Sequence, residues 1–197
     1  MRRIFACIFL FVAPLMAQAG LGTGEPAAGA TGPVFEASLG YAYFSMSTPS
    51  QRVVLTGLDA NGAVKLDRWW GATVDSTYVG TGNVLGTGHT GNVLSCLAGP
   101  VFYPAGRGKT GIFLHALAGA SVVDSAVPVS GTNYLGGWVT HPSYAVGGGF
   151  ERYLFGPVAV RAQADYQRTT FVNPTGTMQG QNDLRLTTSF VYRFGNR

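Results

Sequence analysis

The sequence predicts an all-β fold, an eight-stranded antiparallel transmembrane β-barrel with up-and-down topology, from three observations. First, only 11% of the 197 residues are charged, against roughly 25% in a soluble domain, yet the mean hydropathy is only +0.19. Second, Gly (29 residues), Phe (12) and Tyr (9) are frequent. Third, segments of about ten residues alternate between apolar and polar side chains, as strands between lipid and a polar interior do.

The N-terminus carries an export signal. Two arginines at positions 2 and 3 precede the apolar run 4–16, and an A-x-A cleavage motif ends at Ala19. This pattern is typical of a secretory signal peptide, and the run is shorter than the roughly 20 residues of a transmembrane helix. We therefore expect a cleaved signal peptide at residues 1–19 and a flexible periplasmic leader, rich in Gly, Ala, Thr and Pro, at 20–33. The barrel is expected at 34–194.

Four strands are predicted in the first half of the barrel, each with one apolar and one polar face. In the first, Leu39 and Tyr41 oppose Glu36; the second alternates most weakly; in the third, Trp70 opposes Asp75. The predicted strands are Val34–Ser45, Arg52–Lys65, Trp69–Val79 and Val93–Tyr103.

Four more strands are predicted in the second half. The last alternates most cleanly, because Leu186 and Phe190 share one parity while Arg185 and Arg193 share the other. Such alternation over a dozen residues indicates a strand that separates two environments. The predicted strands are Gly111–Val123, Ser143–Leu154, Pro157–Arg168 and Asp183–Phe194.

The predicted connections alternate in length. Those after the second, fourth and sixth strands are short, and those after the third, fifth and seventh are long: Gly80–Asn92, Asp124–Pro142 and Thr169–Asn182. Bacterial barrels place short turns in the periplasm and long loops outside, so both termini of the barrel are expected in the periplasm. A soluble lipocalin-like or jelly-roll domain stays open, because alternation alone does not say which face is inside; the abundant aromatics favour the membrane barrel.

The final strand ends in an aromatic alternation. The segment 184–195, with Phe190, Tyr192 and Phe194, resembles the closing strand of OmpA-like small outer-membrane β-barrel proteins, although three residues follow the last aromatic. Short motifs such as Ala98-Gly99-Pro100 and Gly147-Gly148-Gly149 add to the resemblance by their order. The resemblance implies the outer membrane of a Gram-negative cell, lipid and lipopolysaccharide as neighbours, and the barrel-assembly machinery as the partner that recognises these aromatics.

The faces predicted to point inward carry both acids and bases. Eight strands enclose little space, which side chains normally fill, and buried charges must pair. We therefore predict a polar network that occludes the lumen, formed by Glu36, Asp75, His115, Glu151, Arg161, Asp165, Arg185 and Arg193. A narrow channel for ions or solutes is the alternative.

No catalytic residues are predicted, and one alternative is kept. His141-Pro142-Ser143 has the His-x-Ser spacing that resembles outer-membrane lipid A deacylases. Both side chains, however, share the inward parity of Glu151, whereas acyl chains lie outside the barrel, and Pro142 disfavours a regular strand. Metal-binding motifs such as HExxH or CxxC do not occur, and neither does a basic stripe, so no metal, cofactor or nucleic acid is expected.

The long predicted loop 124–142 contains Tyr134 and Trp138. Long loops on a rigid scaffold are where recognition usually takes place, so these aromatics are candidate contacts for an extracellular ligand. Together these features predict a non-enzymatic integral outer-membrane barrel with a structural or surface-interaction role.

Overall fold

A computed structural model describes the barrel region of the chain. The described residues are 33–47, 52–83, 88, 90–107, 109–125, 127–130, 133–135, 138–172 and 178–194. The signal peptide and the leader, except Pro33, fall outside these ranges and stay predictions. Over the same ranges, no helix is long and apolar enough to cross a membrane.

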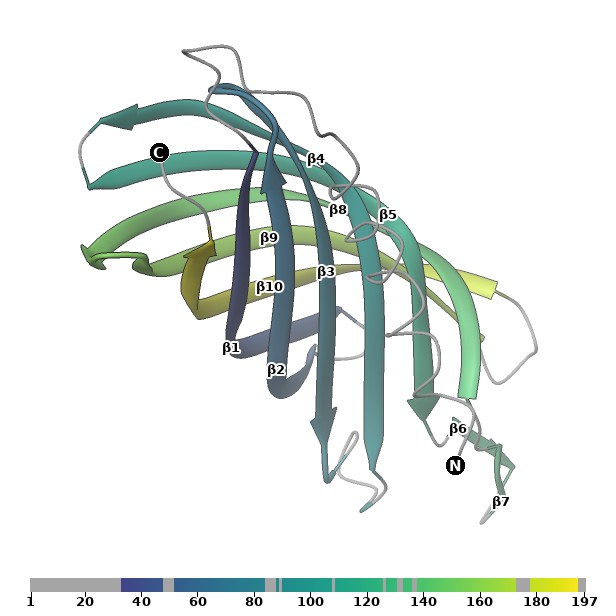
Figure 1. The fold of residues 1–197 in the computed structure, drawn as a ribbon. Helices are drawn as coiled ribbons and strands as arrows, with labels where there is room; N and C mark the ends of the chain where they lie inside the picture. Colours follow the sequence, from purple (N-terminus) through teal and green to yellow (C-terminus); the bar gives the residue numbers. More distant parts are fainter. Residues whose placement is uncertain are drawn as a thin grey trace. The chain divides into compact units, whose positions relative to one another are not determined.

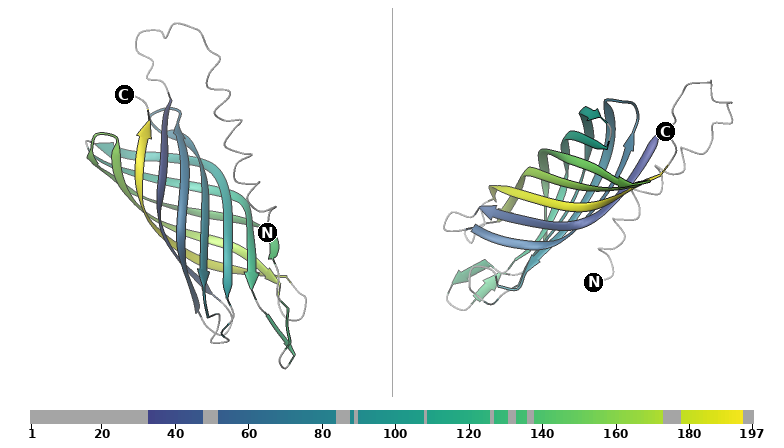
Figure 2. Two further views of the ribbon diagram at one scale, coloured as in Figure 1. Left: turned by 60° about the horizontal axis from the view of Figure 1, so that its bottom comes forward. Right: turned by 90° about the vertical axis from the view of Figure 1, so that its left-hand side faces the viewer.

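Eight strands form a closed antiparallel barrel in the order β1-β10-β9-β8-β5-β4-β3-β2, which confirms the predicted fold class (Figures 1 and 2). Two further strands, β6 and β7, pair as a small ribbon in the connection between β5 and β8. The bounds are β1 Val34–Ser47, β2 Arg52–Lys65, β3 Trp70–Thr81, β4 Gly91–Arg107, β5 Thr110–Ser125, β6 Val127–Ser130, β7 Asn133–Leu135, β8 Trp138–Phe155, β9 Val158–Val172 and β10 Met178–Phe194.

The first strand closes the barrel by pairing on both sides. It pairs with β10 from Phe35↔Phe194 to Ser45↔Leu184, and with β2 along its whole length. Closure matters because an open sheet edge in lipid would leave backbone N–H and C=O groups without partners, at several kcal/mol each.

The alternation places apolar side chains outside and polar ones inside. On β10, Leu186 and Phe190 are 41% and 69% exposed, whereas Arg185 and Ser189, which have the other parity, are each at most 5% exposed. This is the reverse of a soluble barrel, whose polar faces would be outside. The apolar outer face therefore favours the membrane barrel over the soluble alternative.

The two ends of the barrel differ. The connections β2–β3, β4–β5 and β8–β9 are short and define the short-turn end, while those after β3 and β5 are longer and lie at the opposite, long-loop end. Figure 2 shows the β6–β7 ribbon at this long-loop end. The prediction of a long loop at Thr169–Asn182 is wrong: β9 continues to Val172 and β10 begins at Met178, because Thr169 and Gln181 still pair in the sheet.

The expectation that Pro142 disfavours a regular strand is also wrong at this position, because the sixth barrel strand begins before it and not at Ser143. Strand β8 runs through it from Trp138, and Pro142 pairs with Ala120 of β5. The register with β9 begins only at Tyr144↔Arg168. At Pro142 the strand is therefore paired only with β5. Because there is no β9 partner to which a backbone N–H would donate, proline is tolerated here as it is in edge strands.

Candidate functional site

All eight side chains predicted to line the lumen point into it. Seven of them are at most 6% exposed, and Arg193, near the short-turn end, is partly buried. They come from six of the eight barrel strands. The strand period of two brings them together, because every second side chain faces the same side.

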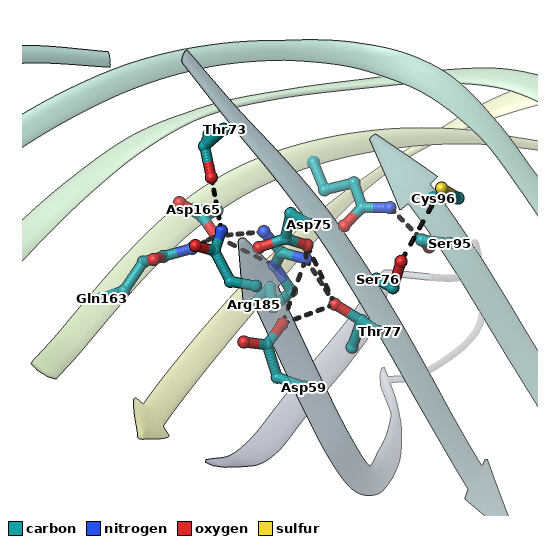
Figure 3. A network of polar contacts seen from close by, with 12 residues as sticks. Asp59, Thr73, Asp75, Ser76, Thr77, Ser95, Cys96, Gln163, Asp165 and Arg185 are labelled. Atoms are coloured by element: carbon teal, nitrogen blue, oxygen red, sulfur yellow. Dashed lines mark hydrogen bonds and ion pairs between the residues drawn. The ribbon is translucent and has the colours of Figure 1, made fainter. Parts of the chain in front are cut away.

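Arg185 lies at the centre of what we call the aspartate cluster, formed with Asp59, Asp75, Asp165 and His115. Figure 3 shows Arg185 among the three aspartates. Its Nη2 and Nε donate to Asp165 Oδ2 at 2.7 and 2.9 Å, and its Nη1 donates to Asp75. Asp59 Oδ2 is 3.9 Å from the same Nη1. One fully buried guanidinium therefore contacts carboxylates from three strands.

Several of these contacts cross the lumen. Arg185 belongs to β10 and Asp75 to β3, which are three strand positions apart in the closed sheet. The same Nη1 donates to Thr77 Oγ1 of β3 at 2.5 Å, and Thr77 in turn donates to Asp59 Oδ2 on the neighbouring strand β2 at 2.9 Å. Because both walls share the same bonds, the cluster fills the middle of the barrel.

A second group, the glutamate cluster, lies near the short-turn end and comprises Glu36, Glu151, Lys65, Arg161 and Arg193. Arg161 Nη2 donates to Glu36 Oε2 at 2.9 Å and to Glu151 Oε2 at 2.6 Å. Lys65 Nζ lies 2.7 Å from Glu36 Oε1, and Arg193 Nη2 donates to the same oxygen at 2.9 Å. Two buried carboxylates are thus shared by three cations.

Aromatic rings pack against each cation of the glutamate cluster. A cation over the face of an aromatic ring is attracted by the ring quadrupole, which helps to offset the loss of hydration. The distances from cation to ring centre are 4.6 Å for Lys65 over Tyr103, 5.0 Å for Arg161 over Phe113 and 4.1 Å for Arg193 over Tyr153.

Toward the long-loop end, a row of neutral polar groups crosses the lumen. Gln167 Nε2 donates to Ser95 Oγ at 3.0 Å and to Ser143 Oγ at 3.3 Å, and the hydroxyls of Ser95 and Ser121 are 3.0 Å apart. Gln167 is fully buried and belongs to β9, three positions from β4 in the sheet. Hydrogen bonds rather than ion pairs therefore join the walls at this level.

The sequence predicted a polar interior, but the interior of the barrel is polar only in part. At the long-loop ends of β1 to β5, a buried apolar cluster fills the lumen: Ala42, Phe44, Met46, Val53, Leu55, Val79, Val93 and Val123. Strand parity assigns these side chains to the inside just as it does the charged ones. The error came from taking polarity as the mark of the interior, although a filled barrel can equally bury apolar side chains.

Sequence reasoning omitted three charged residues from the luminal set. Asp59 and Lys65 of β2 belong to the two clusters, and Asp183 of β10 accepts a hydrogen bond of 2.5 Å from Thr169. Each shares the inward parity of its strand. The signal was therefore present in the alternation, but weak in β2.

The His-x-Ser pair has no catalytic arrangement among the described residues. His141 and Ser143 point inward and are 5% and 2% exposed. Ser143 Oγ donates to the carbonyl of Arg168 at 2.9 Å, and His141 Nε2 has no hydrogen-bond partner. A serine nucleophile needs its base within hydrogen-bond reach.

The aromatics at the end of β10 all face outward. Phe190, Tyr192 and Phe194 are 69%, 48% and 50% exposed, and the last two rings contact each other with centres 4.7 Å apart. Of the two loop aromatics, Trp138 opens β8 and is 44% exposed, and Tyr134 lies in β7. Over the described ranges, no group of three or more His, Cys, Asp or Glu side chains is arranged to hold a metal ion.

The barrel is similar to solved structures of small outer-membrane proteins. Neisserial surface protein A superposes with a TM-score of 0.65 at 15% identity, covering 84% of this chain and 99% of that one. Ail of Yersinia pestis, in complex with the heparin analogue sucrose octasulfate, gives 0.52 at 16% identity, covering 82% and 99%. OprG of Pseudomonas aeruginosa gives 0.52 at 12% identity, covering 85% and 99%.

No protein-family model and no curated protein matches the chain. The identities to the solved structures are low, so these similarities establish the fold and not the activity. The resemblance to OmpA-like small outer-membrane β-barrels, predicted from the sequence, is confirmed at the level of the fold.

Proposed function

We propose that this chain is a non-enzymatic integral outer-membrane protein with an occluded lumen and a structural or surface-interaction role at its long-loop end. One observation carries the proposal: Lys65 and Glu151 approach to 3.7 Å although β2 and β8 lie four positions apart, on opposite walls of an eight-stranded barrel. Ion pairs that join opposite walls leave little room for a solute between them.

The support for occlusion extends beyond that pair. The aspartate cluster, the Gln167 row and the apolar cluster follow it toward the long-loop end, so buried side chains fill successive levels of the lumen. Opening a path would require breaking several charge-assisted hydrogen bonds at once, each stronger than a neutral one. A narrow channel remains the alternative, and it would need such a rearrangement.

The support for membrane insertion comes from the outer wall. Its exposed side chains include Leu39, Ile112, Val146, Phe150 and Phe190, each between 47% and 69% exposed. In water such a wall would be an extensive apolar patch of the kind that marks interaction sites. In a bilayer it faces lipid, with the short turns in the periplasm and the long loops outside.

The support for a surface role is the long-loop end. Its connections include the two longest of the barrel, after β3 and after β5, and the second of these contains the β6–β7 ribbon. A similar barrel, Ail, has been solved with a heparin analogue bound. By analogy, we propose that the loops of this chain contact an extracellular ligand, with Tyr134 and Trp138 as candidate contacts.

Assembly and catalysis complete the proposal. The exposed aromatics Phe190, Tyr192 and Phe194 are proposed as the signal for the barrel-assembly machinery. The protein is proposed not to be an enzyme, because the acyl chains that a lipid A deacylase would cut lie outside the wall, whereas His141 and Ser143 lie inside it.

Planar-bilayer recording of the purified, refolded protein tests the occluded lumen. The expected result is an absence of porin-sized steps. Regular steps of nanosiemens size would overturn occlusion and support the channel. Migration of unheated and heated samples on a denaturing gel verifies that the protein tested is a folded barrel.

Protease treatment of whole cells tests the orientation. Cleavage is expected only in the connections after β3 and β5, around residues 82–90 and 126–137, which lie at the long-loop end. Cleavage in the turns at 66–69 or 156–157 would show that the barrel is inverted.

A further inference from the structure

Few charged side chains lie on the outer wall of the barrel. Among the strand residues whose side chains the structure describes, the charged residues that face outward are Arg52, Asp124, Arg152 and Arg168. A charge on the lipid face is costly at the middle of a bilayer and nearly free of cost at its surface. Arg168, four residues before the end of β9, therefore marks the level of the headgroups at the long-loop end.

Arg168 belongs to a row of hydrogen-bond donors across three neighbouring strands. It is paired with Tyr144 of β8 on one side and with Asn182 of β10 on the other. All three face outward and are exposed. A phenol, a guanidinium and a carboxamide thus stand side by side on the wall, since directly opposite residues on neighbouring strands are in contact range. We call these residues the donor row.

The next outward level toward the short-turn end carries no charged side chain and no carboxamide. It consists of Val146, Tyr166 and Leu184, which are paired across the same three strands and are 58%, 51% and 43% exposed. The change from this level to the donor row takes place within one pleat. It places the boundary between the apolar band and the headgroup region directly at Arg168.

The guanidinium of Arg168 extends away from the apolar band. It lies over Gly180 of β10, where an added Cβ would be 2.9 Å from Nη2 and 3.0 Å from Nε. Gly180 is two residues nearer the long-loop end than Asn182, so the side chain reaches toward the headgroups, as arginines at membrane boundaries do. A larger residue at 180 would push the guanidinium off the wall.

Within the part of the chain that the structure describes, the guanidinium of Arg168 has no acidic partner. No carboxylate of the described residues lies within ion-pair distance of Arg168, whereas the buried arginines Arg161 and Arg185 each have at least two. An arginine without a partner, flanked by two neutral donors at the headgroup level, is complementary to an anion with several acceptor oxygens. Arginine binds phosphate through two parallel N–H bonds.

We propose that the donor row Tyr144–Arg168–Asn182 binds a phosphate group of a phosphorylated glycolipid in the outer leaflet. The apolar level of Val146, Tyr166 and Leu184 then contacts the acyl chains of the same molecule. This inference rests on the proposed orientation, in which the long-loop end lies in the outer leaflet.

Native mass spectrometry of the folded protein in detergent tests it, with bisphosphorylated lipid A as the probe. Replacing one charge-assisted contact changes binding by about tenfold or more, so R168Q is expected to lose at least that factor in bound lipid A. R168K, which keeps the charge but not the paired donors, is expected to bind an amount of lipid A between those of the wild type and R168Q. G180V, which displaces the guanidinium while keeping it, is expected to weaken binding as well.

Two controls make the outcome specific. R52Q removes an outward arginine at the same end of the barrel, on β2, three strand positions from β9, and is expected to bind like the wild type. Dephosphorylated lipid A is expected to bind the wild type as weakly as phosphorylated lipid A binds R168Q. Every variant is first checked for heat-modifiable migration on a gel, which shows whether it has folded as a barrel. Failure of the barrel proposed above is thereby distinguished from failure of lipid A binding.

Any of the following results would overturn the assignment. The first is equal binding of lipid A by folded R168Q and the wild type. The second is equal binding of the phosphorylated and dephosphorylated probes. The third is displacement by inorganic phosphate, or equal retention of phosphatidylglycerol, which would identify a general phosphate site and not a glycolipid site.

Discussion

His115 Nε2 lies 2.7 Å from Asp165 Oδ1, and this contact passes across the backbone of Gly147. Gly147 of β8 is paired with His115 of β5 on one side and with Asp165 of β9 on the other. The two side chains can meet over the intervening strand because Gly147 has no side chain of its own. A Cβ there would collide with Asp165 Oδ1 and with the carbonyl of Ala164. Since a carboxylate only accepts, His115 Nε2 carries the hydrogen.

Replacing Gly147 with alanine is therefore expected to destabilise the barrel. Overpacking in a filled interior costs about 1–3 kcal/mol. Here the displaced group is the carboxylate of Asp165, which also accepts a hydrogen bond from Arg185. Gly62→Ala is the matched control, because a Cβ at this β2 glycine meets nothing within 4 Å. Urea unfolding in lipid vesicles measures both, and equal midpoints for the two variants would show that the space above Gly147 is not needed.

Arg185→Met is expected to be among the most destabilising single substitutions. It would leave Asp75 and Asp165 buried without their cation, and removing one partner of a buried ion pair costs about 3–5 kcal/mol. Arg52→Met, on the exposed first residue of β2, is the control and should change the free energy of unfolding by less than about 0.5 kcal/mol.

A second substitution distinguishes the loss of charge balance from the loss of packing. If the buried carboxylates are the cause, Arg185→Met combined with Asp165→Asn should recover part of the lost stability, since one uncompensated charge is removed. A double variant less stable than Arg185→Met alone would indicate that Asp165 serves mainly as a hydrogen-bond acceptor for His115 and Gln163.

The barrel could be predicted because its physical signal is local. Period-two alternation in β10 and β9 requires no knowledge of partners, and the connections show where each strand turns. The strand ends were less predictable. Polar residues such as Thr169 and Gln181 were taken as loop, yet they continue the ladder because backbone pairing does not depend on side-chain polarity. Pro142 was misjudged because the sequence does not reveal that β8 has only one partner there.

The candidate site was predictable as a list and not as an arrangement. Parity placed Glu36, Asp165 and Arg185 inside, but which acid meets which base depends on the register and the shear of the closed sheet. Arg185 with Asp165 follows from direct pairing of β10 with β9. Arg185 with Asp75 joins strands far apart in the order and follows only from closure. The donor row likewise requires the register of three strands.

Asp67 gives the turn between β2 and β3 a pH dependence. Its Oδ1 accepts hydrogen bonds from the backbone N–H of Trp69 at 2.6 Å and of Trp70 at 2.8 Å, and these lower the pKa of Asp67 below its ordinary value of 3.8. A lowered folded-state pKa contributes stability above the unfolded value, and this is lost as the pH falls through the folded value.

The stability difference between the wild type and Asp67→Ala is therefore expected to be constant above about pH 5 and to vanish in stronger acid. Urea midpoints over this pH range measure the difference, and NMR titration of the carboxyl gives its pKa directly. A carboxyl that titrates at or above 3.8 would show that the two hydrogen bonds do not persist in solution.

Cys96 provides a direct measure of what the outer wall faces. It is exposed on β4, paired between Ser76 and Ala120, and it is a free thiol. A charged, water-soluble maleimide does not enter the hydrocarbon of a bilayer, so it should leave Cys96 unlabelled in vesicles and label it once the chain is unfolded in urea. Gly82→Cys in a Cys96→Ser background is the positive control, since residue 82 is exposed in the connection after β3. Rapid labelling of Cys96 in the folded protein would mean that the wall faces water, and the soluble barrel would have to be reconsidered.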